Sequence, residues 1–242
     1  MRSIMGEARS AAGTTVDTVA ALRAQLDRLQ GRRLDVPVLP VPQALASLLP
    51  GGGLRPGSSY SLGRSTSLLF SLLARPSQDG AWCAAVGMPH LGAEAARAAG
   101  VDLSRLVLVP DPGERWLAVT AAVADVLPVV AVRPPARAKD ADISRLAARM
   151  REREAVLLVQ GPWPQTEAMI DVGDPSWSGL GDGYGILEGR ELTVTVTSRR
   201  FPVPRTGRVL LPDAAGGVAG AAGGMPGRAS AAPVRTGLRA VG

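Results

Sequence analysis

The middle of the chain, residues 57–160, alternates short apolar runs with stretches of helical length. The runs are SSYSLG, AWCAAVG, LVLVP, PVVAV and AVLLVQ, and the segments between them predict helices over 66–74, 92–100, 114–127 and 140–154. Strands that are apolar on both faces and are separated by helices indicate a parallel sheet covered on both sides. The pattern therefore predicts an α/β fold.

The pattern changes after Gln160. Residues 166–172 and the pair 183–189 and 190–200 alternate apolar and polar positions, which predicts antiparallel strands with a turn near Glu188–Arg190. The segment DPSWSGLGDG (174–183) has the composition of a loop. From Phe201 onward, a bias toward Pro, Gly, Ala and Arg predicts disorder.

The N-terminal part has a different character. Apolar residues at helical spacing predict an amphipathic helix over 16–30, followed by an extended arm rich in proline. The sequence thus divides into a flexible N-terminus (1–15), a helix with its arm (16–56), an α/β core (57–200) and a disordered tail (201–242).

Charge and composition narrow the function classes. The net charge is +6, and residues 201–242 hold five arginines against Asp213, so the rest of the chain is close to neutral. A near-neutral body argues against a large nucleic-acid groove, which needs many phosphate contacts. Cys83 is the only cysteine and lies in an apolar run, which predicts a small core residue. No apolar span has membrane length and no signal-peptide core is found, so we expect a cytoplasmic protein.

One segment has the layout of a phosphate-binding loop. The strand GSSYSLG ends at Gly63 and runs into a helix whose first turn holds Ser65, Thr66 and Ser67. In that context the motif G-x-x-x-x-G-K-[ST] binds phosphates. Here the second glycine and the lysine are missing, and Lys139 is the only lysine of the chain. The positions are those of a degenerate phosphate loop.

The order and spacing of these segments over residues 57–200 resemble the RecA-like family. The resemblance rests on GSSYSLG followed by TSLLFSLLA, on GAWCAAVGMPH, on the stretch from Ala95 to Leu127, on ISRLAARMREREAVLLVQ and on the closing strands GDGYGILEGRELTVTVTSRR. It implies a mostly parallel, twisted sheet flanked by helices, with an antiparallel hairpin at the C-terminal end.

The resemblance also shows which catalytic parts are missing. Pro89 stands where the family has its catalytic glutamate, and Arg133 where a strand would end in the aspartate associated with magnesium. Gln160 matches the phosphate-sensing glutamine, and His90 also matches a family position, but both are expected to be structural here. Because phosphoryl transfer needs charge neutralisation and a positioned water, we expect no ATP hydrolysis, no catalytic residues, no cofactor and no metal.

Among RecA-like proteins without a working ATP site, the chain is similar to the ImuA-type accessory proteins of bacterial translesion mutagenesis, in their actinobacterial form. The helix VAALRAQLDRLQG and the lead-in VLPVPQALASLLPGGGLRPGSSYSLG carry this resemblance. It implies a non-catalytic adaptor in the DNA damage (SOS) response that binds an inactive Y-family polymerase homologue and, through it, an error-prone replicative-type polymerase. Self-association through the N-terminal helix is also implied. The expected contact residues are Leu22, Leu26, Leu29, Arg199, Arg200, Arg205 and Arg208.

Three alternatives stay open. The first is a weak ATPase that uses helix-end amides and a distant arginine. The second is a single-stranded DNA binder that uses Trp163, Arg133 and the basic tail, although a tryptophan between two prolines more often packs against its own domain. The third is an SOS-type division inhibitor on the same degenerate fold.

Overall fold

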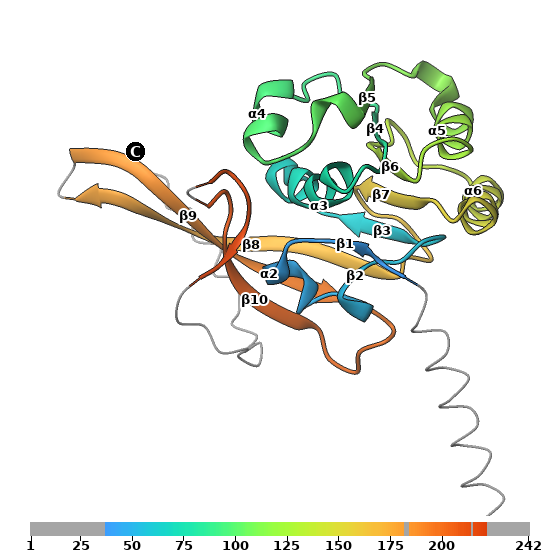
Figure 1. Ribbon diagram of the computed structural model, residues 1–242. Coiled ribbons are helices and arrows are strands. Elements are labelled where there is room, and N and C mark those ends of the chain that lie inside the picture. The colour runs from blue at the N-terminus through green and yellow to red at the C-terminus, as the bar shows by residue number, and fades with distance from the viewer. Residues whose placement is uncertain (1–36, 182–183, 214, 222–242) are drawn as a thin grey trace, which may run out of the picture. The chain divides into compact units, whose positions relative to one another are not determined.

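The computed structural model describes residues 37–181, 184–213 and 215–221. Within these ranges the protein has a mixed α/β fold around a nine-stranded, mostly parallel sheet, as the apolar pattern predicted (Figure 1). The strand order is β11-β10-β9-β8-β3-β7-β6-β4-β5. The strands are β3 (Ser59–Leu62), β4 (Cys83–Val86), β5 (Leu106–Val109), β6 (Val129–Val132), β7 (Val156–Gln160), β8 (Ala168–Gly181), β9 (Tyr184–Thr197), β10 (Arg205–Leu210) and β11 (Ala219–Gly220).

Helices cover both faces of the parallel part of the sheet. Along β4, Cys83 and Ala85 pack into one apolar cluster with α3, while Ala84 and Val86 pack into a second cluster with α5 and α6. Successive strand residues point to opposite faces, so a strand buried on both sides must be apolar throughout. The described helices are α2 (Gln43–Ala46), α3 (Thr66–Gln78), α4 (Ala93–Ala98), α5 (Trp116–Ala124) and α6 (Asp140–Arg153).

Helix α3 continues four residues beyond the predicted end at Ala74. Pro76 lies inside its last turn and is buried, although it cannot donate a backbone hydrogen bond. Ser77 Oγ donates to the carbonyl of Ala74 at 2.8 Å and accepts from the backbone N–H of Asp102 at 3.0 Å. Burial and these side-chain bonds therefore carry the helix past its proline.

The antiparallel half of the sheet corrects two predictions. Residues 174–181, predicted as a loop, belong to β8, and Glu188–Arg190, predicted as a turn, lies inside β9. Strand β8 pairs in parallel with β3 and antiparallel with β9, so Trp177 lies opposite Arg190. This long ladder outweighs the Gly, Ser and Asp residues that favour a loop locally.

The prediction of disorder from Phe201 onward is wrong for the described residues of that stretch. Strand β10 pairs with β9 over its whole length, and β11 pairs with β10. Val209 and Leu211 are each 1% exposed and belong to the core. The remaining residues 222–242 lie outside the described part of the chain.

The extended arm, predicted apart from the α/β core, belongs to the same compact unit from Val38 onward. Strand β1 (Leu39–Pro40) pairs antiparallel with β2 (Gly53–Leu54), and apolar residues of this segment join the main core cluster. The predicted helix over 16–30, with Leu22, Leu26 and Leu29, lies outside the described residues. No helix in the described ranges is long and apolar enough to cross a bilayer.

Candidate functional site

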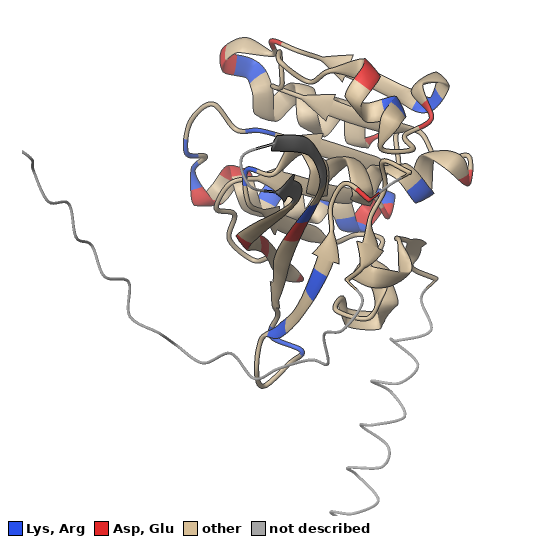
Figure 2. Ribbon diagram, turned by 90° about the vertical axis from the view of Figure 1, so that its left-hand side faces the viewer, with Lys and Arg blue, Asp and Glu red and all other residues tan. Residues whose placement is uncertain are grey.

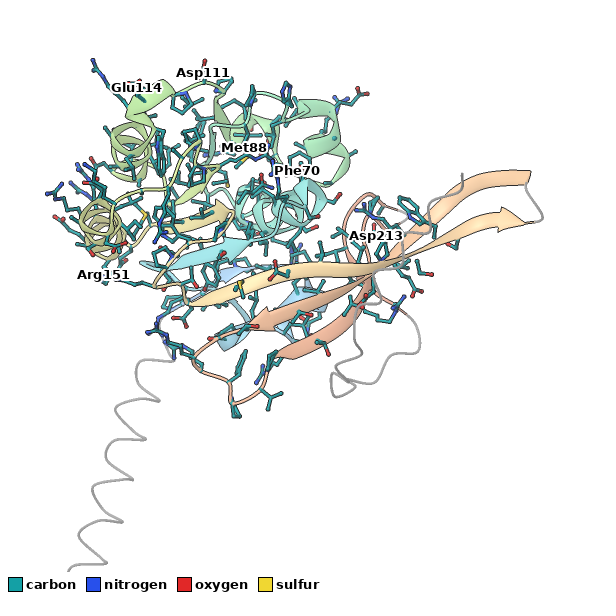
Figure 3. The ribbon with its side chains drawn as sticks, turned by 180° about the vertical axis from the view of Figure 1, so that it is seen from behind. Phe70, Met88, Asp111, Glu114, Arg151 and Asp213 are labelled. Atoms are coloured by element: carbon teal, nitrogen blue, oxygen red, sulfur yellow. The ribbon has the colours of Figure 1, made fainter. Side chains whose placement is uncertain are left out.

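A cleft of about 1140 Å³ opens at the carboxyl edge of the five strands β3 to β7. The segments that follow these strands supply its walls, and its lining includes Asp111 and Glu114 from the segment between β5 and α5, both labelled in Figure 3. The chain leaves β4 toward α4 on one face of the sheet and leaves β6 toward α6 on the other. Ligands of open α/β sheets bind where such connections part, so this cleft is the candidate site.

The loop between β3 and α3 has no free glycine amide to offer a phosphate. Gly63 donates its N–H to the carbonyl of Ile170 in β8 at 3.1 Å. A Cβ atom placed on Gly63 would lie 3.1 Å from Asp171 Oδ1, so a carboxylate rests against the loop. Phosphate-binding loops need free backbone N–H groups and cations, and here a negative charge opposes the ligand.

The first turn of α3 is capped from within the protein. Ser65 is the N-cap, and its hydroxyl accepts from the backbone N–H of Leu68 at 3.2 Å. Ser67 Oγ accepts from Arg190 Nη2 at 3.1 Å, and Arg190 Nε donates to the carbonyl of Leu211 at 2.9 Å. Arg190 thereby joins the helix start to β9 and to the exit of β10. Thr66, the first residue of α3, is half-buried.

Two of the positions that the sequence singled out are bonded to each other. Arg133 follows β6 and donates from Nε and Nη2 to Gln160 Oε1 at 3.0 and 2.6 Å. Gln160 is 4% exposed, and its Nε2 donates to the carbonyl of Ser65 at 3.4 Å. Guanidinium, amide and loop carbonyl form one chain of contacts that joins the ends of β6 and β7 to the loop after β3.

The segment after β4 reaches the cleft with only some of its residues. Pro89 lines the cleft and is exposed, while His90 is exposed and is not among the lining residues. Gly87 has a φ of +72°, and a Cβ atom on it would lie 2.7 Å from the carbonyl oxygen of Arg133. Only glycine allows this close approach between the ends of β4 and β6.

Elsewhere in and beside the cleft, opposite charges balance and a tryptophan pair is buried. Arg64 and Arg133 face Asp111 and Glu114 across it, so the cleft has no strong net charge. Among the described residues no cluster of His, Cys, Asp or Glu could hold a metal ion. Trp163 is 9% exposed and meets Trp116 edge to face at 6.3 Å between ring centroids. It packs on its own domain, as expected.

Asp171 and Arg190 were not found by sequence reasoning. Both lie on strands, and both reach the start of α3 only because β8 pairs with β3 and β9 pairs with β8. No local motif surrounds either residue, so the strand pairing itself is the only signal for them.

The arginines predicted to bind a partner differ in their surroundings. Arg200 pairs with Glu167, and Arg208 with Glu191 at 2.9 Å. Arg205 lies over the ring of Phe201 at 3.7 Å, while Arg199 is exposed and has no ion pair in the described residues. Figure 2 shows basic and acidic positions interspersed over the elements, which fits a body without a nucleic-acid groove.

Comparison with known proteins gives two matches. Residues 47–165 match the family model described as "MT3502 N-terminal domain". A protein of Mycobacterium tuberculosis, "Uncharacterized protein Rv3395c", is 31% identical over 172 residues, which span 69% of this chain and 77% of that protein. The segments that carry Gly63, Pro89, Arg133 and Gln160 fall within residues 47–165.

Proposed function

The chain belongs to the same family as the uncharacterized protein Rv3395c of Mycobacterium tuberculosis, and we propose that it is a catalytically inactive RecA-like adaptor in DNA-damage tolerance. In this role it helps to assemble the proteins of error-prone translesion synthesis, in the cytoplasm, and transfers no phosphate. The RecA-like part of the proposal is supported by β3, Gly63 and the capped helix α3, which follow one another as in a phosphate-loop unit.

The single observation that carries the proposal is the pairing of Arg133 with Gln160 (2.6 Å). A guanidinium fixed at this point opposes a divalent cation, and the glutamine that would report on a phosphate already accepts from the guanidinium. Phosphoryl transfer depends on a metal ion and on neutralised phosphate charge. Arg133 and Gln160 instead stabilise the fold by bonding to each other. We therefore infer that the protein acts through protein–protein contacts.

The antiparallel half of the sheet offers a contact surface. Trp177 on β8 is 56% exposed, with the guanidinium of Arg190 5.5 Å from its ring centroid. An exposed tryptophan is typical of the residues that dominate protein interfaces. We propose that this surface binds the inactive Y-family polymerase homologue of the mutasome and, through it, the error-prone replicative-type polymerase. Residues 16–30 are proposed to serve self-association.

The test is co-precipitation with the Y-family homologue. We expect Trp177→Ala to lower the affinity at least about tenfold, a loss common for a central aromatic contact. Val126→Asp is the matched control, because Val126 is 79% exposed and lies after α5, away from the antiparallel strands. If Trp177→Ala captures the homologue as well as the unchanged protein does, the interface does not include Trp177. If the unchanged chain does not capture the homologue, the adaptor role is refuted.

The same experiment examines residues 222–242 with a chain that ends at Ala221, which keeps β10 and β11 intact. Equal capture would remove that segment from the interface. A calorimetric titration with ATP and magnesium separates the adaptor from a weak ATPase. We expect no binding in the micromolar range, and such binding would overturn our interpretation of the cleft.

A further inference from the structure

A second hollow, of about 380 Å³, lies at the opposite, amino edge of the sheet. It is formed where the entry to β3, the entry to β8, the turn after β9 and the helix α6 come together. Its lining is rich in polar residues, among them Ser58, Ser59 and Thr166, together with arginines. Nothing in the cleft described above extends into it.

Three arginines from two elements line this hollow. Arg151 comes from α6 (Figure 3), and Arg199 and Arg200 come from the turn between β9 and β10. The only carboxylate in its wall is Glu167, which is already paired with Arg200. In the described part of the chain Arg151 and Arg199 have no ion pair, so the hollow holds an uncompensated positive charge.

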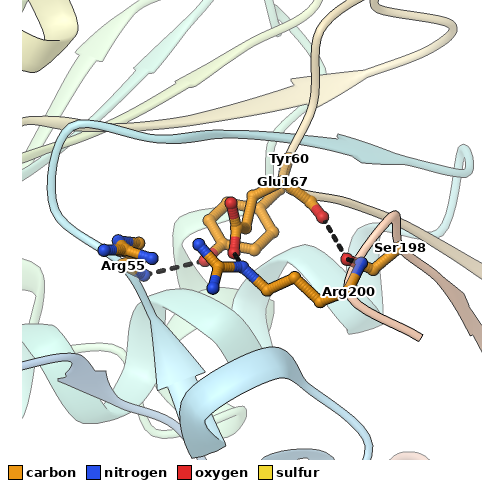
Figure 4. A network of polar contacts seen from close by, with 5 residues as sticks. All are labelled: Arg55, Tyr60, Glu167, Ser198 and Arg200. Carbon is orange, nitrogen blue, oxygen red and sulfur yellow. Dashed lines mark hydrogen bonds and ion pairs between the residues drawn. The ribbon is translucent and has the colours of Figure 1, made fainter. Parts of the chain in front are cut away.

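A network of contacts fixes this turn in place (Figure 4). Ser198 Oγ donates to the carbonyl of Glu167 at 2.6 Å and accepts from the N–H of Arg200 at 3.2 Å. Beneath it, the hydroxyl of Tyr60 accepts from the N–H of Arg55 at 2.7 Å. Burial raises the pKa of Tyr60, so the phenol stays neutral and adds no negative charge. The backbone of the turn that carries Arg199 is therefore held in place before any ligand binds.

The loop that closes the hollow is in an unusual backbone conformation. Gln165, one of its lining residues, has a φ of +56°. A glutamine in the left-handed region is uncommon, and such residues gather at binding sites, where the surrounding structure holds them. The observation is independent of the charge of the hollow and points to the same place.

We propose that this hollow at the amino edge binds a single phosphate group between Arg151 and Arg199, with the serine and threonine hydroxyls as further donors. Guanidinium groups match phosphate oxygens in geometry and charge. With two arginines free of ion pairs in the described residues, the hollow suits one phosphate rather than a run of them. The source is either a free phosphate or one phosphate of a single-stranded DNA backbone. The inference does not depend on the adaptor role proposed above.

The first measurement is thermal unfolding of the full chain in inorganic phosphate, compared with sodium chloride of equal ionic strength. We expect phosphate to raise the midpoint for the unchanged protein and the double variant Arg151→Gln/Arg199→Gln to lose that rise. The control is Arg75→Gln/Arg97→Gln, which removes two exposed arginines of α3 and α4 that line neither hollow. General stabilisation by the salt acts on both variants alike.

The second measurement is the affinity for a fluorescent single-stranded oligonucleotide at several salt concentrations. For a DNA backbone as the source, we expect about a tenfold loss in the Arg151→Gln/Arg199→Gln variant. The salt slope of the unchanged protein should be shallow, about −0.7 for one neutralised phosphate. A response to inorganic phosphate alone identifies a free phosphate as the ligand.

Equal behaviour of the two double variants in both measurements would overturn the proposal. Since all four substituted side chains are exposed, the variants are expected to fold, and circular dichroism in chloride checks this. If the Arg151→Gln/Arg199→Gln variant unfolds in chloride at the same temperature as the unchanged protein, its stability is intact. A missing rise of the midpoint in phosphate then reflects lost phosphate binding.

Discussion

At the scale of single residues, Arg133 holds the ends of three strands together. Its guanidinium gives Gln160 Oε1 two hydrogen bonds, and Gln160 in turn reaches the carbonyl of Ser65. Each link joins a different strand end, so the three residues hold the ends of β3, β6 and β7 together.

Replacing Arg133 with alanine should therefore destabilise the protein. The buried oxygen of Gln160 would lose both donors, which costs about 1–3 kcal/mol of unfolding free energy. Arg137→Ala is the control, since Arg137 lies on the same loop and is exposed. Urea denaturation measures both variants, and equal stability would show that the Arg133–Gln160 contact contributes nothing.

Cys83 gives the protein a dependence on alkaline pH. Burial raises the pKa of its thiol from 9.0 to about 12. The unfolded chain therefore loses this proton first, and the stabilisation, complete below pH 9, declines as the pH rises from 9 through 12. Between pH 8 and pH 10 we expect a loss of roughly 1 kcal/mol. Urea unfolding of Cys83→Ala at the two pH values should show no such loss of unfolding free energy. A loss equal to that of the unchanged protein would show that the thiol is not its cause.

At the scale of elements, the parallel strands and their helices could be predicted from the sequence, but the antiparallel half could not. Strands β4, β6 and β7 are apolar on both faces, so composition alone reveals them. Strand β8 contains two glycines and two serines after Gly173 and owes its form to β9 and β3 on either side. For the same reason Arg133 and Gln160 could be found by position, whereas Asp171 and Arg190 could not.

Strand β10 should be essential to the fold. A chain that ends at Arg200 loses Val209 and Leu211, each worth about 1.5–3 kcal/mol of burial, and exposes the ladder edge of β9. We expect this truncation to unfold at a lower temperature and to aggregate, while the chain ending at Ala221 keeps the full-length midpoint. Equal midpoints for the two truncations would show that β10 adds nothing to the core.

At the scale of the whole molecule, the two edges of the sheet differ in the groups that they offer to a ligand. The carboxyl edge, where α/β proteins bind ligands, is crossed by internal contacts and is balanced in charge. The amino edge carries the uncompensated arginines, and the antiparallel extension carries the exposed tryptophan. The sequence predicted contact surfaces at the two ends of the chain. In the part of the C-terminal end that the structure describes, however, β10 and β11 are strands of the central sheet.

The position of β3 has a consequence for synthesis on the ribosome. Tyr60 in β3 lies opposite Leu158 in β7 and Ala168 in β8, so both neighbours of the strand are made about a hundred residues after it. Until then the strand has no ladder, and contacts so distant in sequence form slowly. A nascent chain released before β8 emerges would leave β3 open on one side, a ready template for pairing with other chains. The residues from Val156 onward therefore decide whether β3 finds its place in the sheet.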